Sequence, residues 1–294
     1  MDIRTVVIAN KITLFERLTR NGPDARLKAL FDARAPIVTK IEASHCATVG
    51  TRDRVRHELE RAGVKVVEHR RGGRIADGRF DAVIVVGGDG TVLDVARGVR
   101  ATPIIAVNSS PVASVGHFCC ATGDDFPTVL ERIRSGDLGP TRLARLRLVV
   151  DGVEHPYPAL NDALFAAVLP AETARYILRV GGREEEQKSS GIWVSTAAGS
   201  TGAVLSAGGV VMDIDEGGLQ YVVREPFYRW DEDRRYRLVQ GIEHTGTLSI
   251  TSRMINGGVY LDGQRTAARV GYACRVDLSP DGPPLNIVLK ARRP

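Results

Sequence analysis

Hydrophobic and polar positions in the first half of the chain alternate between two patterns. Short apolar runs rich in β-branched residues predict buried strands, and apolar residues spaced every three or four positions predict helices. Strands are predicted at residues 5–9, 64–68, 81–86 and 103–107. Helices are predicted around Leu14 and Leu18, from a Thr51 N-cap to Gly63, over residues 93–99, and from Asp124 or Asp125 to Gly136. Strands and helices in alternation predict a parallel, right-handed βαβ array.

The pattern changes at about residue 142, where helical periodicity nearly disappears. Short strands are predicted at residues 146–150, 163–168, 177–180, 192–195, 248–251 and 259–261, separated by Gly, Asp and Pro turns. Short strands at close spacing predict a mostly antiparallel β domain. Asp151 and Gly152 suit a hairpin turn. The three glutamates at residues 184–186 are predicted to form an exposed loop tip rather than a metal site.

We therefore expect a Rossmann-like α/β N-terminal domain over residues 1–141 and an all-β C-terminal domain over residues 142–274. The last apolar run, residues 285–289, permits one more strand in the first domain, so residues 275–294 are candidates to complete it. A chain of 294 residues that is 43% hydrophobic has enough material for two such cores.

The composition of the chain indicates where in the cell the protein is located and what class of ligand it binds. No apolar run approaches the roughly 20 residues of a membrane helix, and no signal peptide is recognisable, so we expect a cytoplasmic protein that does not associate with membranes. A net charge of +5 suits a polyanionic ligand. No basic helix interleaved with aromatic residues is present, which favours a small phosphorylated ligand over nucleic acid. The four cysteines and six histidines lack metal-ligand spacing, so no metal site is assigned and the cysteines are expected to be reduced.

Residues 81–93, Asp-Ala-Val-Ile-Val-Val-Gly-Gly-Asp-Gly-Thr-Val-Leu, are the leading candidate for a functional site. Because they lack Cβ atoms, Gly87, Gly88 and Gly90 let the backbone approach a ligand, and N–H groups at a helix start bind phosphate. Asp89 is unusual there, since a carboxylate repels phosphate unless it holds a metal ion or takes a proton. It is therefore the candidate catalytic residue. The alternative is a strand-to-helix turn in which Asp89 only caps the helix.

Three other polar groups have both a functional and a structural interpretation. Lys11 and Thr13 follow the first strand, where open α/β sheets present ligand contacts, although a lysine there also suits a solvated loop. Asn161 and Asp162 stand between apolar residues and need partners if buried, with a surface turn as the alternative. Residues 195–201, Ser-Thr-Ala-Ala-Gly-Ser-Thr, fit a nucleotide-binding turn and equally a Ser/Thr helix cap.

Further motifs accompany the glycine turn in a fixed order along the chain. They are residues 108–111 (Asn-Ser-Ser-Pro), 114–118 (Ser-Val-Gly-His-Phe), 160–162 (Leu-Asn-Asp), 188–191 (Lys-Ser-Ser-Gly) and 195–202. Together with residues 87–91 they resemble the NAD kinase family over most of the chain. The similarity is greatest to the divergent branch with the animal mitochondrial and plant NADH-preferring kinases, where Arg-Glu-Pro, here residues 224–226, also occurs.

This resemblance implies a fold like that of NAD kinases and diacylglycerol kinases, with a nucleotide between the two domains. It implies Mg²⁺ and ATP as cofactors, NAD or NADH as substrate, and Asp89 near the 2′-hydroxyl of the adenosine ribose. The implied binding residues are Lys11, Gly87, Gly88, Gly90, Thr91, Asn108, Asn161, Asp162, Lys188, Ser190, Thr196, Gly199, Ser200, Thr201 and Ser206. Many bacterial relatives have an aspartate at the position of Ser190 and a tyrosine at that of Ala203.

The favoured function is phosphorylation of this 2′-hydroxyl by Mg-ATP to give NADP or NADPH. Phosphoryl transfer requires phosphate-binding N–H groups, which the glycine turn offers, and a group that orients or deprotonates the hydroxyl, which is Asp89. Lys11 or Lys188 would offset charge on the transferred group. No Walker lysine follows the glycines, which disfavours a P-loop enzyme.

Two other functions are compatible with parts of the sequence. A lipid or sphingoid kinase shares the glycine turn, but it needs an exposed apolar entrance, and the motif at residues 196–201 argues against it. A non-catalytic dinucleotide-binding regulator would keep the pocket and dispense with Asp89. The β domain and Trp230 are candidates for the interface of a homodimer.

Overall fold

The computed structural model divides the chain into two compact units. The first comprises Met1–Thr141 and Asn286–Pro294, and the second comprises Arg142–Leu285. The structure describes residues 1–290 except 21, 23, 70–74, 113, 229, 230, 232–234, 245 and 264. Trp230, the predicted interface residue, lies outside the described residues.

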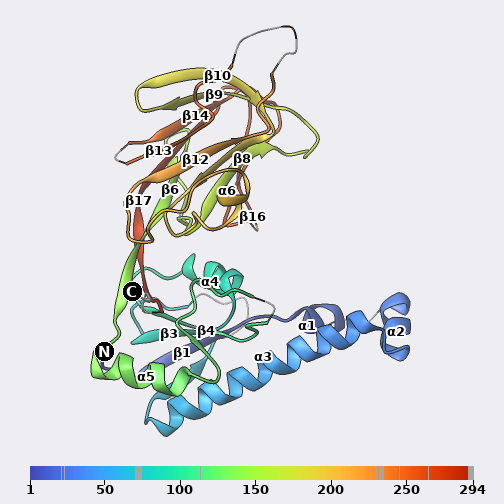
Figure 1. Ribbon diagram of the computed structural model, residues 1–294, viewed down its shortest axis with the longest axis vertical. Coiled ribbons are helices and arrows are strands. Elements are labelled where there is room, and N and C mark those ends of the chain that lie inside the picture. The colour runs from blue at the N-terminus through green and yellow to red at the C-terminus, as the bar shows by residue number, and fades with distance from the viewer. Residues whose placement is uncertain are drawn as a thin grey trace. The chain divides into compact units, whose positions relative to one another are not determined.

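The first unit contains the alternating strands and helices that the sequence predicts (Figure 1). Its elements are β1 (Thr5–Asn10), α1 (Leu14–Thr19), α2 (Ala25–Asp32), α3 (Pro36–Arg61), β2 (Lys65–Glu68), β3 (Ala82–Gly87), α4 (Asp89–Ala96), β4 (Ile104–Asn108), β5 (Ala121–Thr122) and α5 (Phe126–Ser135). Its main strands follow the spatial order β4-β3-β1-β2 and pair in parallel. The predicted parallel βαβ array is therefore present.

The core of the first unit lies between this sheet and the helices α3 and α5. Val55 and Leu59 of α3 pack with Phe126 and Ile133 of α5 against strand residues such as Ile84. All six residues of β3 are buried, which explains why its sequence is a continuous apolar run instead of an alternating one. The carboxyl end of this strand is where the glycine turn begins.

The predicted start of the long helix is wrong. α3 begins at Pro36, with Ala35 as N-cap and proline in the first turn, and continues through Thr51, which is buried inside the helix. Proline is favoured at this first position because its fixed φ suits a helix and its missing N–H has no intrahelical acceptor there. The predicted end is close to the observed one, since Gly63 follows the C-cap with a φ of +75°.

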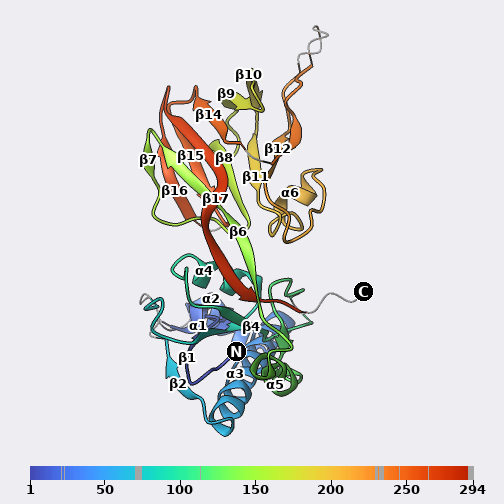
Figure 2. The ribbon, with the colours of Figure 1, turned by 90° about the vertical axis from the view of Figure 1, so that its left-hand side faces the viewer.

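The second unit is built from two mostly antiparallel sheets (Figure 2). Its elements are β6 (Pro140–Val150), β7 (Val153–Glu154), β8 (Asp162–Ala167), β9 (Ala174–Val180), β10 (Arg183–Ser189), β11 (Gly191–Ser195), α6 (Ala203–Ser206), β12 (Leu219–Arg224), β13 (Gln240–Glu243), β14 (Leu248–Ser252), β15 (Gly257–Leu261), β16 (Arg265–Val270) and β17 (Arg275–Val288). One sheet has the order β13-β12-β11-β8-β15-β16. Phe165 and Val259 from this sheet share a core with Tyr176 and Ile250 from the other, so the two sheets pack face to face.

Two sequence-based expectations for this unit have different outcomes. Asp151 and Gly152 form the predicted hairpin turn, with φ of +48° and +80°, and the flanking residues Val150 and Val153 pair across it. The glutamates at residues 184–186 do not form a loop tip, because they lie within strand β10 and pair with β9. β10 is the last strand at its edge of the sheet, where charged side chains are normal.

Strands β6 and β17 each contain residues of both units. β17 pairs with β14 in antiparallel fashion through residues such as Val276, and its end pairs in parallel with β4 through Ile287 and Val288. β6 pairs with β17, and the fully buried Arg145 on β6 donates hydrogen bonds to the carbonyl groups of Pro283 and Pro284. A buried guanidinium thus satisfies carbonyl oxygens in a proline-containing strand.

Candidate active site

The glycine turn joins β3 to α4, and the packing inside the protein itself demands two of its glycines. A Cβ atom on Gly87 would lie 2.4 Å from Oγ1 of Thr91, and one on Gly88 would lie 2.4 Å from Oγ of Ser114. Gly88 is the N-cap of α4, and its carbonyl oxygen accepts the Thr91 N–H at 2.9 Å. Gly90 is exposed at the second position of the helix. Of the three glycines, therefore, Gly87 and Gly88 lie against neighbouring side chains, and Gly90 leaves the backbone exposed at the first turn of α4.

The Asp89 carboxylate is held by a neighbouring loop rather than by its own helix. Its two oxygens accept the backbone N–H groups of His117 at 3.1 Å and Phe118 at 2.9 Å. Asp89 is the first residue of α4, and the N-cap is Gly88, so the alternative that Asp89 merely caps the helix is wrong. Each carboxylate oxygen has a second lone pair, which leaves the half-buried group able to accept a proton or hydrogen bond from a ligand hydroxyl.

Asn108 shapes the loop that supplies these N–H groups. Its side chain is buried; its Oδ1 accepts the Ser110 N–H at 3.1 Å and its Nδ2 donates to the Ser114 carbonyl at 2.9 Å. Gly116 has a φ of +69°, and a Cβ atom there would lie 2.5 Å from Nδ2 of Asn108. These two hydrogen bonds of the Asn108 amide therefore stabilise the loop that positions Asp89.

Lys11 lies against the glycine turn. Its backbone N–H donates to the Val86 carbonyl at 2.9 Å, and its Cβ would be 3.2 Å from a Cβ atom on Gly87. Thr13 is the N-cap of α1 in a capping box with Glu16, and its Oγ1 is 2.9 Å from Nδ1 of His45. The fold therefore brings Lys11 and the residues of the turn together, whereas Thr13 has a structural role in capping α1.

Asn161 and Asp162 form a second polar group, at the start of β8 in the second unit. Asp162 is 5% exposed, and burial together with the charge of Asp262 raises its pKa to about 7. The buried Oδ1 atom of Asn161 has no hydrogen-bond partner among the described residues. A surface turn is therefore the wrong interpretation. Buried polar atoms without partners are rare and costly, so a ligand that satisfies them would gain affinity.

The segment at residues 195–202 packs directly on Asn161. The Thr196 hydroxyl donates to the Leu160 carbonyl at 2.5 Å and accepts the Gly199 N–H at 3.1 Å. A Cβ atom on Gly199 would lie 2.1 Å from the Asn161 carbonyl oxygen. Ser200 Oγ accepts the Met212 N–H at 3.0 Å, so this hydroxyl also forms a hydrogen bond within the protein.

The short helix α6 follows this segment and begins after Gly202, without a side-chain cap. The alternative that the Ser and Thr hydroxyls cap a helix is therefore wrong. Thr201 is exposed before α6, and Ser206 is exposed at its last residue. These two predicted residues lie at the surface beside α6, whereas Thr196 and Ser200 are buried.

Lys188 and Ser190 are not brought together with Asn161 and Asp162. Lys188 is exposed on β10, with its N–H donating to the Tyr236 hydroxyl at 3.2 Å, and Ser190 precedes β11. β11 pairs with β8 so that Ser195 faces Asp162 at the far end of the strand. At about 3.3 Å per residue, the five steps from Ser190 to Ser195 separate Ser190 from Asp162 by roughly 17 Å along the strand.

Asp262 is the residue of this region that the sequence interpretation missed. Its carboxylate accepts the N–H groups of Leu160 at 3.2 Å, Asn161 at 2.8 Å and Asp162 at 3.4 Å. The available signal was the Asp-Gly pair at residues 262–263, which by itself predicts only a hairpin turn.

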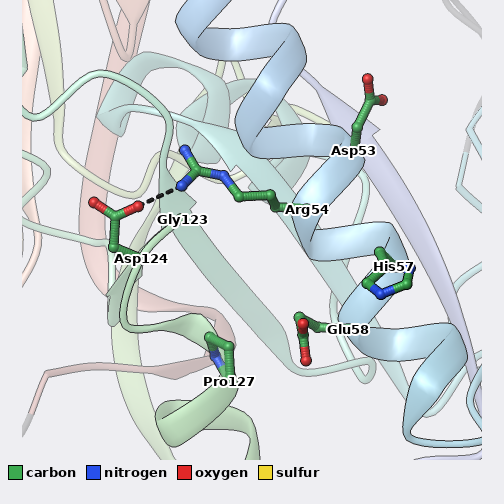
Figure 3. A pocket seen from close by; sticks show the side chains of 7 residues that line it. All are labelled: Asp53, Arg54, His57, Glu58, Gly123, Asp124 and Pro127. Atoms are coloured by element: carbon green, nitrogen blue, oxygen red, sulfur yellow. Dashed lines mark hydrogen bonds and ion pairs between the residues drawn. The ribbon is translucent and has the colours of Figure 1, made fainter.

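A separate groove of about 430 Å³ lies in the first unit between α3 and the segment before α5 (Figure 3). An ion pair between Arg54 and Asp124 spans it, and Asp53, His57 and Glu58 line its α3 side. None of the predicted site residues, all of which are described, lines this groove. Its mixed charges do not favour an anionic ligand.

Two further findings for the described part of the chain concern metal sites and membrane-spanning helices. No group of three or more His, Cys, Asp or Glu side chains is arranged to hold a metal ion. No helix there has both the length and the apolar character needed to cross a membrane.

Relatives with assigned activities match most of the chain. Residues 25–138 match the family model described as the ATP-NAD kinase N-terminal domain. A probable NADH kinase of rice (Oryza sativa subsp. japonica) is 34% identical over 232 residues, which is 71% of each chain. The NADH kinase of Arabidopsis thaliana is 31% identical over 232 residues, covering 71% of this chain and 73% of the relative.

Two solved structures share the fold over nearly the whole chain. An NAD kinase from Archaeoglobus fulgidus in complex with ATP has a TM-score of 0.68 at 21% identity, covering 97% of this chain and 93% of that one. Yeast NADH kinase complexed with NADH has a TM-score of 0.71 at 14% identity, covering 99% and 84%. The predicted fold class, an α/β domain followed by a β domain, is thereby confirmed.

Proposed function

This chain belongs to the NAD kinase family, and from that premise we propose that it transfers the γ-phosphoryl group of ATP to the adenosine-ribose 2′-hydroxyl of NAD or NADH. The observation that carries the proposal is the arrangement at the glycine turn. Asp89 is fixed by the N–H groups of His117 and Phe118 and retains lone pairs for a hydroxyl. The products are NADP and NADPH.

Within this proposal Asp89 orients the acceptor hydroxyl and accepts its proton as the bond to phosphorus forms. Phosphoryl transfer needs positioning and charge stabilisation more than covalent catalysis, and the first N–H groups of α4 with Lys11 offer these for phosphate oxygens. The absence of a three-ligand metal cluster among the described residues is compatible with Mg²⁺ held largely by the phosphates and water. Bound in that way, Mg²⁺ neutralises negative charge on the phosphates.

Asn161 and Asp162 are assigned to the dinucleotide. The unpartnered Oδ1 of Asn161 is an acceptor for an amino or hydroxyl donor, and the buried Asp162 carboxylate is an acceptor for ribose hydroxyl groups. The plant relatives named as NADH kinases support a preference for the reduced dinucleotide. The small Ala203 at the start of α6 supports it too, because the common bacterial pattern places a bulky tyrosine there.

Three finer features are part of the proposal. We propose that the reaction requires Mg²⁺, that the protein acts in the cytoplasm, and that it forms a homodimer through the second unit. Unpaired Cys119 and Cys120 in the core support a reducing compartment. Exposed Val210, Val211 and Phe227 support a covered surface on the second unit. Omission of Mg²⁺ and sedimentation of the purified protein test the first and the last of these.

The deciding experiment is incubation of the purified protein with Mg-ATP and either NAD or NADH, with chromatography of the products. We expect NADP or NADPH from at least one substrate, and kinetics on both substrates give the redox preference. Polyphosphate in place of ATP tests the phosphoryl donor. Binding of the dinucleotide without turnover with either donor would instead identify a regulator. Product from a lipid or sphingoid substrate alone would identify a lipid kinase.

A further inference from the structure

Asp262 occupies an unusual position for a charged residue. It forms a tight turn with Gly263 between β15 and β16, and both residues have left-handed backbone, with φ of +49° and +69°. Its side chain is buried, and its own N–H donates to the Asp162 carbonyl oxygen at 2.9 Å. A buried carboxylate is costly unless hydrogen bonds stabilise its charge.

Three hydrogen bonds to the Asp262 carboxylate come from one short segment. Oδ2 accepts the Leu160 N–H at 3.2 Å, and Oδ1 accepts the N–H groups of Asn161 at 2.8 Å and Asp162 at 3.4 Å. Three successive backbone N–H groups therefore donate to one side chain, from a turn about one hundred residues later in the chain. This attachment leaves the two polar side chains of the segment with little freedom to reorient.

A second Asp-Gly turn in the same unit provides an internal comparison. Asp151 has nearly the same φ, +48°, as Asp262, but it is exposed, and its carboxylate accepts the Arg275 N–H at 2.7 Å. The turn geometry alone therefore does not require a buried aspartate bonded to three N–H groups. The burial of Asp262 and its three hydrogen bonds therefore belong to its contact with residues 160–162 and are not a property of the turn.

We propose, building on the function proposed above, that Asp262 is a positioning residue that holds Asn161 and Asp162 in the orientation that binds the dinucleotide. Asp262 contacts the backbone of the site, and its effect on a ligand passes through the two residues that it holds. Binding groups must be fixed to within a fraction of an ångström, so supporting hydrogen bonds of this kind have large effects on affinity.

Asp262→Asn is the informative substitution. Asparagine has the same size and tolerates left-handed backbone, so the turn is preserved. One of the two accepting oxygens becomes an NH₂ donor that faces a backbone N–H, so the three-way attachment cannot form. Asp151→Asn is the matched control, because it makes the same chemical change in the same kind of turn.

The test is calorimetric titration of full-length wild type and both variants with NAD, NADH and ATP, at a temperature well below every melting transition. We expect Asp262→Asn to raise the Kd of the dinucleotide by about tenfold to a hundredfold and to leave the Kd of ATP unchanged. Asp151→Asn is expected to leave both constants unchanged. A merely structural role for Asp262 would not weaken one ligand selectively.

The other outcomes separate the two proposals. An unchanged dinucleotide Kd in Asp262→Asn, with wild type active as a kinase, would overturn the role of Asp262 and leave the proposed function intact. Equal weakening of ATP, or the same weakening in Asp151→Asn, would also overturn that role. Wild type that binds neither dinucleotide would overturn both proposals. If Asp262→Asn does not fold, Asp262→Glu displaces the carboxylate and keeps its charge, with the same expectation and the same overturning result.

Discussion

The Asp89 carboxylate in the first unit accepts two backbone N–H groups, whereas the Asp162 carboxylate in the second accepts no hydrogen bond from the described residues. Asp89 is half-buried beside a helix start, and Asp162 is 5% exposed next to a second carboxylate. Two backbone N–H groups hold the first carboxylate in a fixed orientation. Burial and then the charge of Asp262 raise the pKa of the second, and Oδ1 of its neighbour Asn161 has no hydrogen-bond partner among the residues that the structure describes.

The contrast shows two ways in which a protein can arrange polar groups before a ligand binds. Around Asp89 the protein has already formed the contacts that orient the carboxylate, so little reorganisation is left for the reaction step. Around Asp162 the protein tolerates polar groups that a ligand would satisfy, which lowers stability and raises affinity. Catalysis should therefore depend on the first unit's site, and stability and recognition should be coupled in the second.

The largest expected effect is the loss of turnover in Asp89→Asn. An amide cannot accept the hydroxyl proton, so the rate should fall by about 10²- to 10⁴-fold. Steady-state assays of NADP and NADPH formation with thermal melting test this. Asp94→Asn, on the exposed side of the same helix, is the control and should keep its rate. An Asp89→Asn enzyme within a few-fold of wild type would remove Asp89 from the chemistry.

Gly199→Ala should cause the largest loss of stability. The added methyl group would lie 2.1 Å from the Asn161 carbonyl oxygen, a backbone atom that cannot move without disturbing the start of β8. We expect a loss of about 3 kcal/mol in the free energy of unfolding, measured by denaturant titration. Gly217→Ala, in the same unit with open space around its Cβ position, is the control. Equal stability of the two variants would show that residues 195–202 pack loosely on Asn161.

Asp162→Asn should increase stability in a pH-dependent way. Burial, and then the charge of Asp262, raises the pKa of Asp162 to about 7, so ionising it in the folded state costs free energy. The native state binds the proton more tightly than the unfolded chain, so this cost is absent near pH 4, grows as pH rises, and is complete above about pH 7.

The variant should therefore exceed wild type by on the order of 2 kcal/mol at pH 8, and the difference should shrink at pH 5. Thermal melting across this pH range measures it, and dinucleotide titration should show weaker binding by the more stable variant. A variant that is less stable than wild type at pH 8 would contradict the contrast between the two carboxylates.

Ala203→Tyr should have the smallest effect of the four. Ala203 is half-buried at the first position of α6, so a tyrosine adds bulk beside the segment that contains Thr201. We expect a change of about threefold in the ratio of kcat/KM for NAD and NADH, less than 1 kcal/mol in discrimination. Parallel kinetics on the two substrates measure it. An unchanged ratio would show that the side chain at position 203 does not influence the choice between NAD and NADH.

The features that the sequence predicted well are local. The strand, glycine turn and helix from β3 to α4 lie within fifteen residues of one another, and the family resemblance, confirmed by the rice and Arabidopsis NADH kinases, rests on such motifs. The predicted helix start at Thr51 is wrong because threonine is a common N-cap residue, whereas here tertiary packing buries both Thr48 and Thr51 inside α3.

The features that the sequence could not predict depend on distant partners. The predicted loop tip at residues 184–186 is wrong because a run of charges does not reveal that its strand, β10, lies at the edge of a sheet, which is a property of the whole fold. Asp262 was overlooked because its hydrogen bonds reach residues 160–162, and an Asp-Gly pair contains no information about where its carboxylate points. The carboxylates of Asp89 and Asp162 differ for the same reason, since burial is set by residues far along the chain.

The pairing of β17 with β4 has a consequence for how this protein folds during its synthesis on the ribosome. Ile104 and Ile105 receive their partners Ile287 and Val288 only after every residue of the second unit has been synthesised. Until then one edge of the parallel sheet displays unpaired backbone in an apolar strand, the kind of edge that invites pairing with other chains. We therefore expect the first unit to be most prone to aggregation while the second unit is being translated.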